Sequence, residues 1–288
     1  MLPTFVLLCL SICSVWLPDV GAADGRPVRL WQPLFIAFVA SGLYFGQLTW
    51  PAVLALAATW VCAETSMRLG PGLVTTALTG ATLLLALALA VHLLPGFNNP
   101  LIASDLRLGA HSPPITQYAS LDKGTAGLLL VAYYCRRVKA RAEWPAVAGT
   151  GLAAGAATSF VVVGLVAALG FITPDPKLSP FALMWVPINL LLTCVAEEAF
   201  FRGVVQERLM QAFERSSHRR WVPLAVSSVL FGLVHAGGGI ALIVGAAVAG
   251  VGYGAAYGRT RRIEAAVLAH FTLNAVHFFG FTYPYAVR

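Results

Sequence analysis

The chain has 288 residues, of which 58% are hydrophobic and only 11% are charged, and its mean hydropathy is +0.78. Soluble domains carry about 25% charged residues, so this composition excludes an ordinary soluble protein and predicts an all-α, polytopic transmembrane helix bundle in a lipid bilayer. The net charge is +7, but the basic residues lie in short loops between apolar runs. This pattern is typical of the cytoplasmic loops of membrane proteins and not of a surface that binds nucleic acid, so no nucleic-acid partner is expected.

The first part of the chain predicts several short membrane spans. Residues 2–17 are apolar, and no basic residue precedes them, which favours a first transmembrane helix over a signal peptide cleaved near Val20-Gly21-Ala22. Residues 34–62 are too long for one pass and are interrupted at 47–51, so we expect two short spans there. Residues 73–94 form a clear span rich in Leu and Ala.

Residues 95–123 form the one substantial polar loop. Its prolines and asparagines predict an ordered or re-entrant cap and not a helix. His92 and His111 lie close to it in sequence. Neither has a partner at metal-ligand spacing, so we expect both to be ordinary polar or interfacial residues.

The second part predicts further spans over 128–134, 146–172, 221–235, 240–257 and 265–281, together with a helix that runs to about residue 210. The basic loops lie at 136–141, 208–220 and 259–262, and the loops between them are nearly neutral. By the positive-inside rule these three loops are cytoplasmic and both termini lie outside. We expect eight to ten spans in an integral, multi-pass membrane protein.

Small residues recur at helical spacing in two of these spans. Gly151 and Gly155 lie four residues apart in one, and Gly250, Gly254 and Gly258 form a stripe in another. Such spacing lets helices approach closely, so we expect both stripes to be packing faces.

Two adjacent carboxylates and an arginine continue the apolar helix that precedes residue 210. An ionised side chain at the bilayer centre costs about 3 kcal/mol on insertion scales, so such groups are rare, paired and usually functional. Glu198 and Arg202 lie four residues apart and are predicted to pair, whereas Glu197 points about 100° away. The alternative is a stop-transfer boundary, where the charges only mark the end of a span.

Two other predicted spans carry His235, and His270 with Asn274. Counting about 1.5 Å per residue from the nearest cytoplasmic edge places Glu197, His235, His270 and Asn274 about 16, 21, 12 and 18 Å deep. A single buried histidine is ordinarily a hydrogen-bonded core residue. Four polar groups at comparable depth on three helices instead predict one site.

An acid, two imidazoles and an amide in a cavity of low dielectric constant favour hydrolysis. The acid can take a proton from water, an imidazole can orient that water, and an imidazole with an amide can stabilise an oxyanion. The sequence has no Gly-x-Ser-x-Gly, no His-Glu-x-x-His and no phosphate loop, and its five cysteines are scattered. Water is therefore the predicted nucleophile.

These residues resemble a known family. Glu197-Glu198-x-x-x-Arg202, Phe231-x-x-x-His235 and His270-x-x-x-Asn274, in this order, are similar to the three motifs of the CPBP family (CAAX proteases and bacteriocin-processing enzymes, also called Abi or Rce1-like). The resemblance covers about residues 180–282. It implies a catalytic transmembrane core over 173–288, preceded by transmembrane helices of unassigned role over 1–172.

The resemblance also implies an activity and roles for these residues. The family consists of intramembrane endopeptidases that hydrolyse peptide bonds. By its pattern, Glu197 is the catalytic base, His235 helps to activate the water, and His270 and Asn274 form the oxyanion site. Glu198 and Arg202 are supporting residues. The implied substrate is a membrane-associated peptide or protein, and the implied location is the bacterial inner (plasma) membrane.

The metal dependence stays open at this point. Family members have been described as metalloproteases and as glutamic proteases, and Glu197, His235 and His270 could be three zinc ligands with one open position. The zinc helix motif is absent, and no carboxylate that would hold the histidines is evident. Both features favour the glutamic mechanism, so no cofactor is expected, with zinc as the alternative.

Two other classes of protein are alternatives. In a proton-coupled membrane transporter, the acid and the histidines would form a proton relay, but an inverted repeat would support that reading and none is evident. In a non-catalytic membrane scaffold, the motif would be a packing network. The endopeptidase is the favoured interpretation.

Overall fold

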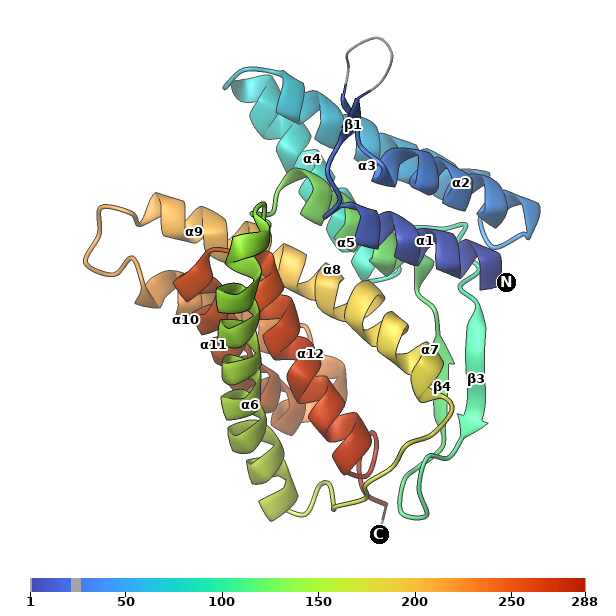
Figure 1. Cartoon of the computed structure of the whole chain (residues 1–288), viewed down its shortest axis with the longest axis vertical. Helices are drawn as coiled ribbons and strands as arrows, with labels where there is room; N and C mark the ends of the chain where they lie inside the picture. Colours follow the sequence, from blue (N-terminus) through green and yellow to red (C-terminus); the bar gives the residue numbers. More distant parts are fainter. Residues whose placement is uncertain (1, 22–26, 288) are drawn as a thin grey trace. The chain divides into compact units, whose positions relative to one another are not determined.

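The computed structural model describes residues 2–21 and 27–287, which are mostly helical (Figure 1). The chain divides into two compact units. The first comprises Met1–Ile102, Tyr118–Tyr134 and Leu191–Glu197, and the second comprises Ala103–Gln117, Cys135–Leu190 and Glu198–Arg288. Ala22 of the alternative cleavage site lies outside the described residues.

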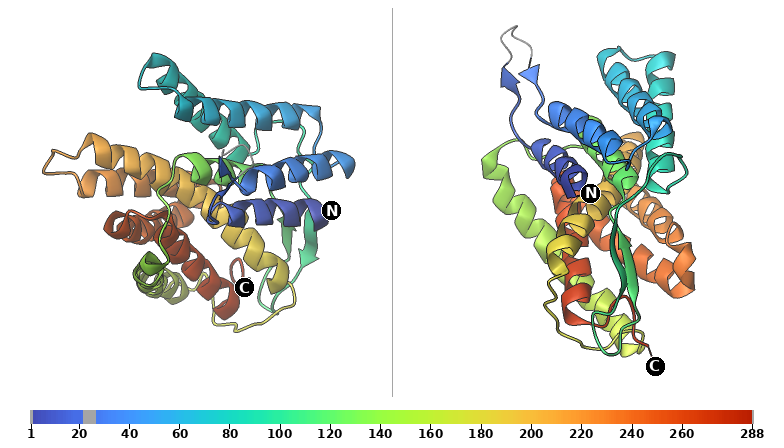
Figure 2. Two further views of the ribbon diagram at one scale, coloured as in Figure 1. Left: turned by 45° about the horizontal axis from the view of Figure 1, so that its top comes forward. Right: turned by 90° about the vertical axis from the view of Figure 1, so that its right-hand side faces the viewer.

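The helices of the first unit are α1 (Leu2–Ser14), α2 (Trp31–Tyr44), α3 (Trp50–Arg68), α4 (Leu73–Ala90) and α5 (Leu121–Tyr133). A short antiparallel pair, β1 (Val20–Gly21) and β2 (Pro27–Val28), follows α1. Helix α1 packs on α2 and α3 packs on α4, whereas α5 contacts α1, α3 and α4 (Figure 2). The aromatic rings of Trp31, Phe35, Trp60 and Tyr133 form part of its core.

The predicted break in the long apolar run 34–62 is confirmed. Helix α2 ends at Tyr44, and α3 begins at Trp50 after the N-cap residue Thr49. Pro51 lies in the first turn of α3, where its missing N–H group leaves no helical hydrogen bond unmade. The proline in the predicted interruption therefore lies in the first turn of the second helix.

The polar loop contains a two-stranded sheet of β3 (Leu101–Leu106) and β4 (Ile115–Tyr118), so the predicted ordered, non-helical segment is confirmed. Its predicted end is wrong, because α5 begins at Leu121 and includes Asp122 and Lys123. His92, expected to be an ordinary polar residue, has its Nδ1 atom 2.7 Å from Oδ2 of Asp122.

The second unit holds η1 (Arg141–Glu143), α6 (Trp144–Ala168), α10 (Trp221–Leu233), η4 (Ala236–Gly238), α11 (Gly239–Thr260) and α12 (Ile263–Gly280). Helices α6, α11 and α12 lie side by side, and α10 packs on α11 (Figures 1 and 2).

Several glycines lie where helices of this unit approach one another closely. A Cβ atom at Gly151 would lie 2.7 Å from the carbonyl oxygen of Ala265, and one at Gly155 would lie 2.6 Å from Cβ of Thr272. A Cβ atom at Gly254 would lie 2.6 Å from Leu224. Larger residues would force the helices apart, so Gly151, Gly155 and Gly254 are confirmed as packing positions. Gly258 of the second predicted stripe is exposed, and a Cβ atom there would meet only Gln206 at 3.7 Å.

One long helix carries the Glu-Glu-x-x-x-Arg motif. It consists of α7 (Ala182–Pro187), η2 (Ile188–Cys194), α8 (Val195–Glu198), η3 (Ala199–Gln206) and α9 (Glu207–Ala212). The η2 and η3 segments are π-helical. Pro187 removes one regular helical hydrogen bond, and η2 begins at the next residue. Wide π turns are rare and often occur at functional sites, and here they flank the four residues of α8 on both sides.

In the part of the chain that the structure describes, five helices are long and apolar enough to cross a membrane: Leu73–Ala90, Arg141–Ala168, Ala182–Ala212, Ala236–Thr260 and Ile263–Gly280. Three shorter helices are also apolar: Leu2–Ser14, Trp31–Tyr44 and Trp221–Leu233. The all-α, polytopic class is therefore confirmed. The number of spans and their orientation stay predictions.

Candidate active site

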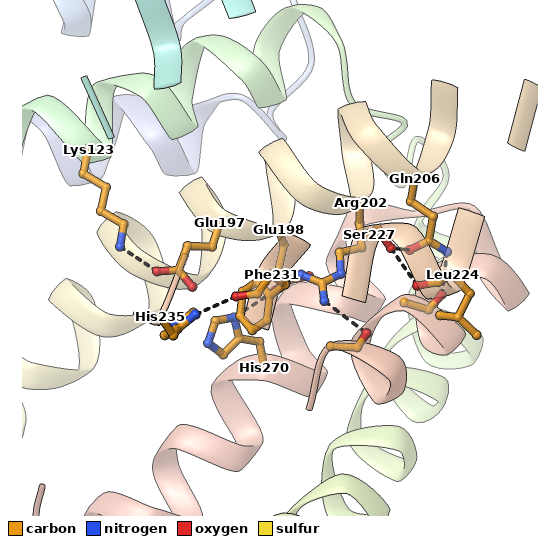
Figure 3. Close-up of polar contacts among 12 residues, drawn as sticks. Lys123, Glu197, Glu198, Arg202, Gln206, Leu224, Ser227, Phe231, His235 and His270 are labelled. Atoms are coloured by element: carbon orange, nitrogen blue, oxygen red, sulfur yellow. Dashed lines mark hydrogen bonds and ion pairs between the residues drawn. The ribbon is translucent and has the colours of Figure 1, made fainter. Parts of the chain in front are cut away.

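The second unit contains a buried network of Glu198, Arg202 and His270 (Figure 3). Nη1 of Arg202 donates to Oε1 of Glu198 at 3.1 Å, and both side chains are fully buried, which confirms the predicted pair. Nη2 of Arg202 donates to the carbonyl oxygen of Gly250 in α11 at 3.0 Å. Nδ1 of His270 lies 2.9 Å from the same carboxylate oxygen, so Glu198 links its own helix to α12.

The hydrogen-bonding properties of these groups place one proton on Nδ1 of His270. Arginine stays protonated in proteins, and a carboxyl group paired with it in an apolar interior is a carboxylate. The Oε1 atom of Glu198 can then only accept hydrogen bonds, so Nδ1 of His270 is the donor. The other ring nitrogen of His270, Nε2, is therefore the one that could act on a substrate.

Aromatic rings enclose this network. The Arg202 guanidinium lies over the Phe231 ring at 4.5 Å and over the Tyr253 ring at 5.4 Å. Tyr253 stacks on the His270 ring at 4.6 Å with an interplanar angle of 13°. Phe231 also contacts the rings of His235 and His270, with centroids 4.8 and 5.7 Å away. The two predicted histidines therefore meet at one aromatic side chain.

His235 lies just beyond the end of a helix and not within a span. The sequence predicts a span through His235, but α10 ends at Leu233, and His235 is the half-buried residue before η4. Its Nδ1 atom lies 2.7 Å from the carbonyl oxygen of Phe231. A carbonyl oxygen only accepts, so Nδ1 carries a proton, and neutral His235 keeps Nε2 as a proton acceptor.

Asn274 lies one turn after His270 on α12, as its spacing predicts. Its amide nitrogen donates to Oδ1 of Asn189 in η2 at 3.1 Å. The sequence did not single out Asn189, because an isolated amide in an apolar run has no spacing signal. The contact nevertheless orients the Asn274 amide toward a fixed partner.

Glu197 belongs to the first unit and precedes Glu198 in α8. Nζ of Lys123 in α5 lies 2.6 Å from Oε1 of Glu197, and the two side chains are 20% and 15% exposed (Figure 3). Sequence reasoning assigned Lys123 to the polar loop and missed this pair. The sequence does mark Lys123 as a cation at the start of an apolar run, but it does not indicate which residue the lysine pairs with.

The structure thus brings Glu198, Arg202, His235 and His270 together around Phe231, with Asn274 on the same helix as His270. Among the described residues, no group of three or more His, Cys, Asp or Glu side chains is arranged to hold a metal ion. The missing carboxylate partner for a histidine, which favoured the glutamic mechanism, is present after all, as Glu198. That argument therefore no longer separates the two mechanisms.

The fold and these contacts define an integral, multi-pass helical membrane protein with a buried acid–base network on neighbouring helices. Comparison with models of known protein families then indicates the class of membrane protein. Residues 179–276 match the family described as "Type II CAAX prenyl endopeptidase Rce1-like", which confirms the resemblance predicted from the three motifs. The match covers about a third of the chain, from before Glu197 to beyond Asn274.

This match establishes the enzyme class. The family consists of endopeptidases, so the chain is a membrane protease of the CAAX type, a hydrolase that acts on peptide bonds. Comparisons with curated proteins and with solved structures give no match.

Proposed function

We propose that the protein is a glutamic-type intramembrane endopeptidase, in which Glu197 and His235 activate a water molecule for attack on a peptide bond. The main support is the network at Glu198, because this neighbour of Glu197 binds His270, and the rings of His270 and His235 both contact Phe231. The residues of all three motifs thus connect to one buried cluster.

In this mechanism Glu197 takes a proton from water as the water oxygen attacks the carbonyl carbon of the substrate. Nε2 of His235 orients the same water or passes on its proton. The negative charge that develops on the carbonyl oxygen is stabilised by hydrogen bonds from His270 and Asn274. When the C–N bond breaks, the proton returns to the leaving nitrogen, and the products are an acid and an amine.

The proposed substrate is a membrane-associated peptide or protein, and the proposed location is the bacterial inner (plasma) membrane. The description of the matched family suggests that prenylated CAAX peptides are the first substrates to test. Two synthetic peptides of one sequence, one farnesylated and one unmodified, would test whether the lipid is recognised. Equal cleavage of both would rule out prenyl recognition and leave the peptidase activity intact.

The proposal is tested by removing the two groups that act on water. Glu197→Gln and His235→Ala should each lower the cleavage rate at least about 10²-fold, because general acid–base catalysis contributes about that much. Glu143→Gln and His218→Ala are matched controls, since Glu143 pairs with Arg262 outside the cluster and His218 lies in an exposed loop. A folded Glu197→Gln protein with near-normal activity would refute the role of Glu197.

The zinc alternative has its own test. If the glutamic mechanism is right, fully active protein should contain far less than one transition-metal ion per chain by elemental analysis. Zinc at one ion per chain, lost together with activity in His270→Ala, would instead identify a zinc enzyme. Resistance to chelators alone decides little, since a buried ion exchanges slowly.

A further inference from the structure

Helix α5 makes an unusually close contact with the helix that carries Glu197, within the first unit. A Cβ atom added at Gly127 would lie 2.8 Å from Cα of Ala196, and one added at Gly124 would lie 2.8 Å from Cγ of Leu192. Only glycine leaves room for backbones this close. Gly127, whose neighbour is backbone, therefore sets the distance between α5 and the residues just before Glu197, and Gly124 packs against the Leu192 side chain.

Lys123 lies on the same face of α5 as Gly127, one turn earlier. The close contact at Gly127 brings its side chain to Glu197, where the Nζ–Oε1 distance is 2.6 Å. Both side chains are largely shielded from solvent, at 20% and 15% exposure. A charge pair in such surroundings is held far more firmly than one on an open surface.

The start of α5 is itself fixed by a polar cluster. Oδ1 of Asp122 accepts hydrogen bonds from the Lys123 backbone N–H at 2.9 Å and from the Asn99 amide at 3.1 Å. Oδ1 of Asn99 accepts from the Leu121 N–H at 2.8 Å, and His92 binds the other oxygen of Asp122 at 2.7 Å. The backbone from which Lys123 projects is therefore held in place.

We propose that Lys123 is a positioning residue for Glu197. Its ammonium group binds Oε1, holds the carboxylate in one orientation and stabilises its ionised form. This inference rests on the proposed role of Glu197. Lys123 lies before residues 179–276, so the family match assigns it no role.

The competing explanation is that Lys123 only neutralises a buried charge. In that case its removal would lower stability but leave the turnover of folded protein unchanged. A positioning role instead lowers kcat and leaves KM nearly unchanged, because the carboxylate acts on water and not on the bound peptide. An error of about 1 Å in the position of a reacting group can cost about 10²-fold in rate.

The experiment compares purified, monodisperse wild type, Lys123→Met, Lys123→Arg and Lys177→Met in one detergent. Lys177 is the matched control, because it is another buried lysine paired with a carboxylate, that of Asp175 at 3.3 Å. We expect kcat of Lys123→Met to fall at least tenfold with KM within about twofold, and Lys123→Arg to recover part of the loss. Lys177→Met should keep wild-type kcat.

The outcomes separate this inference from the proposed function. If Glu197→Gln is inactive but Lys123→Met has wild-type kcat, Lys123 is structural only and the inference is wrong. If Glu197→Gln is active, the proposed function itself fails. Should Lys123→Met not accumulate, Lys123→Gln serves the same comparison, since it removes the charge but keeps a hydrogen-bond donor, and wild-type kcat would again overturn the inference.

Discussion

Arg202→Ala is expected to be one of the most destabilising substitutions in this protein. The arginine and its partner Glu198 form a 3.1 Å pair, and both side chains are fully buried. Water therefore cannot solvate either charge when the other is removed. Truncation leaves the carboxylate charged in an apolar interior and also removes the hydrogen bond to Gly250 and the cation–π contact with Phe231. Breaking a buried pair on one side costs about 3–5 kcal/mol.

The assay is the thermal midpoint of purified protein in detergent. A loss of 3–5 kcal/mol corresponds to a fall of about 10 °C for a chain of this size. The double variant Glu198→Gln/Arg202→Met removes both charges and leaves no ion alone, so its midpoint should lie well above that of Arg202→Ala. If the double variant is no more stable than the single one, the pairing argument is wrong.

Two further predictions concern packing and charge. Gly155→Ala should destabilise by about 1–3 kcal/mol, because its Cβ atom would lie 2.6 Å from Thr272, whereas Gly149→Ala on the same helix meets open space and should leave the thermal midpoint unchanged or slightly higher. Glu207→Gln should lower the midpoint, because this buried carboxylate pairs with two arginines; Glu214→Gln, on an exposed loop, should not.

Local sequence spacing predicted those parts of the site that lie on one helix. Glu198 and Arg202 pair across four residues, and His270 and Asn274 lie on one helix one turn apart. Charge within an apolar run also pointed to the correct region, because an ionised group there needs a partner. The all-α class followed from composition, because a chain this apolar lies in a membrane. There the backbone polar groups must be paired within the protein, and long apolar helices achieve this.

Contacts between distant segments had no such signal. Lys123 and Glu197 are 74 residues apart, and nothing in the sequence pairs them. Depth counting assumed that each span is a regular helix, but α10 ends before His235, and the helix at Glu197 contains two π-helical segments. Residue counts along a helix give depth only where the rise per residue is regular.

The structure gives a physical reason for two adjacent glutamates in the motif. Oε1 of Glu198 accepts from both Arg202 and Nδ1 of His270, so this carboxylate is already committed to holding the histidine. For His270 to donate from Nε2 to an oxyanion, the ring must carry a second proton, because Nδ1–H is given to Glu198. A carboxylate placed at Nδ1 stabilises that doubly protonated ring, and its own charge is balanced by Arg202. In the proposed mechanism Glu198 therefore holds His270, and a second carboxylate is assigned as the base toward water. Glu197, the preceding residue in the chain, is that proposed base, and it pairs with Lys123 on a different helix.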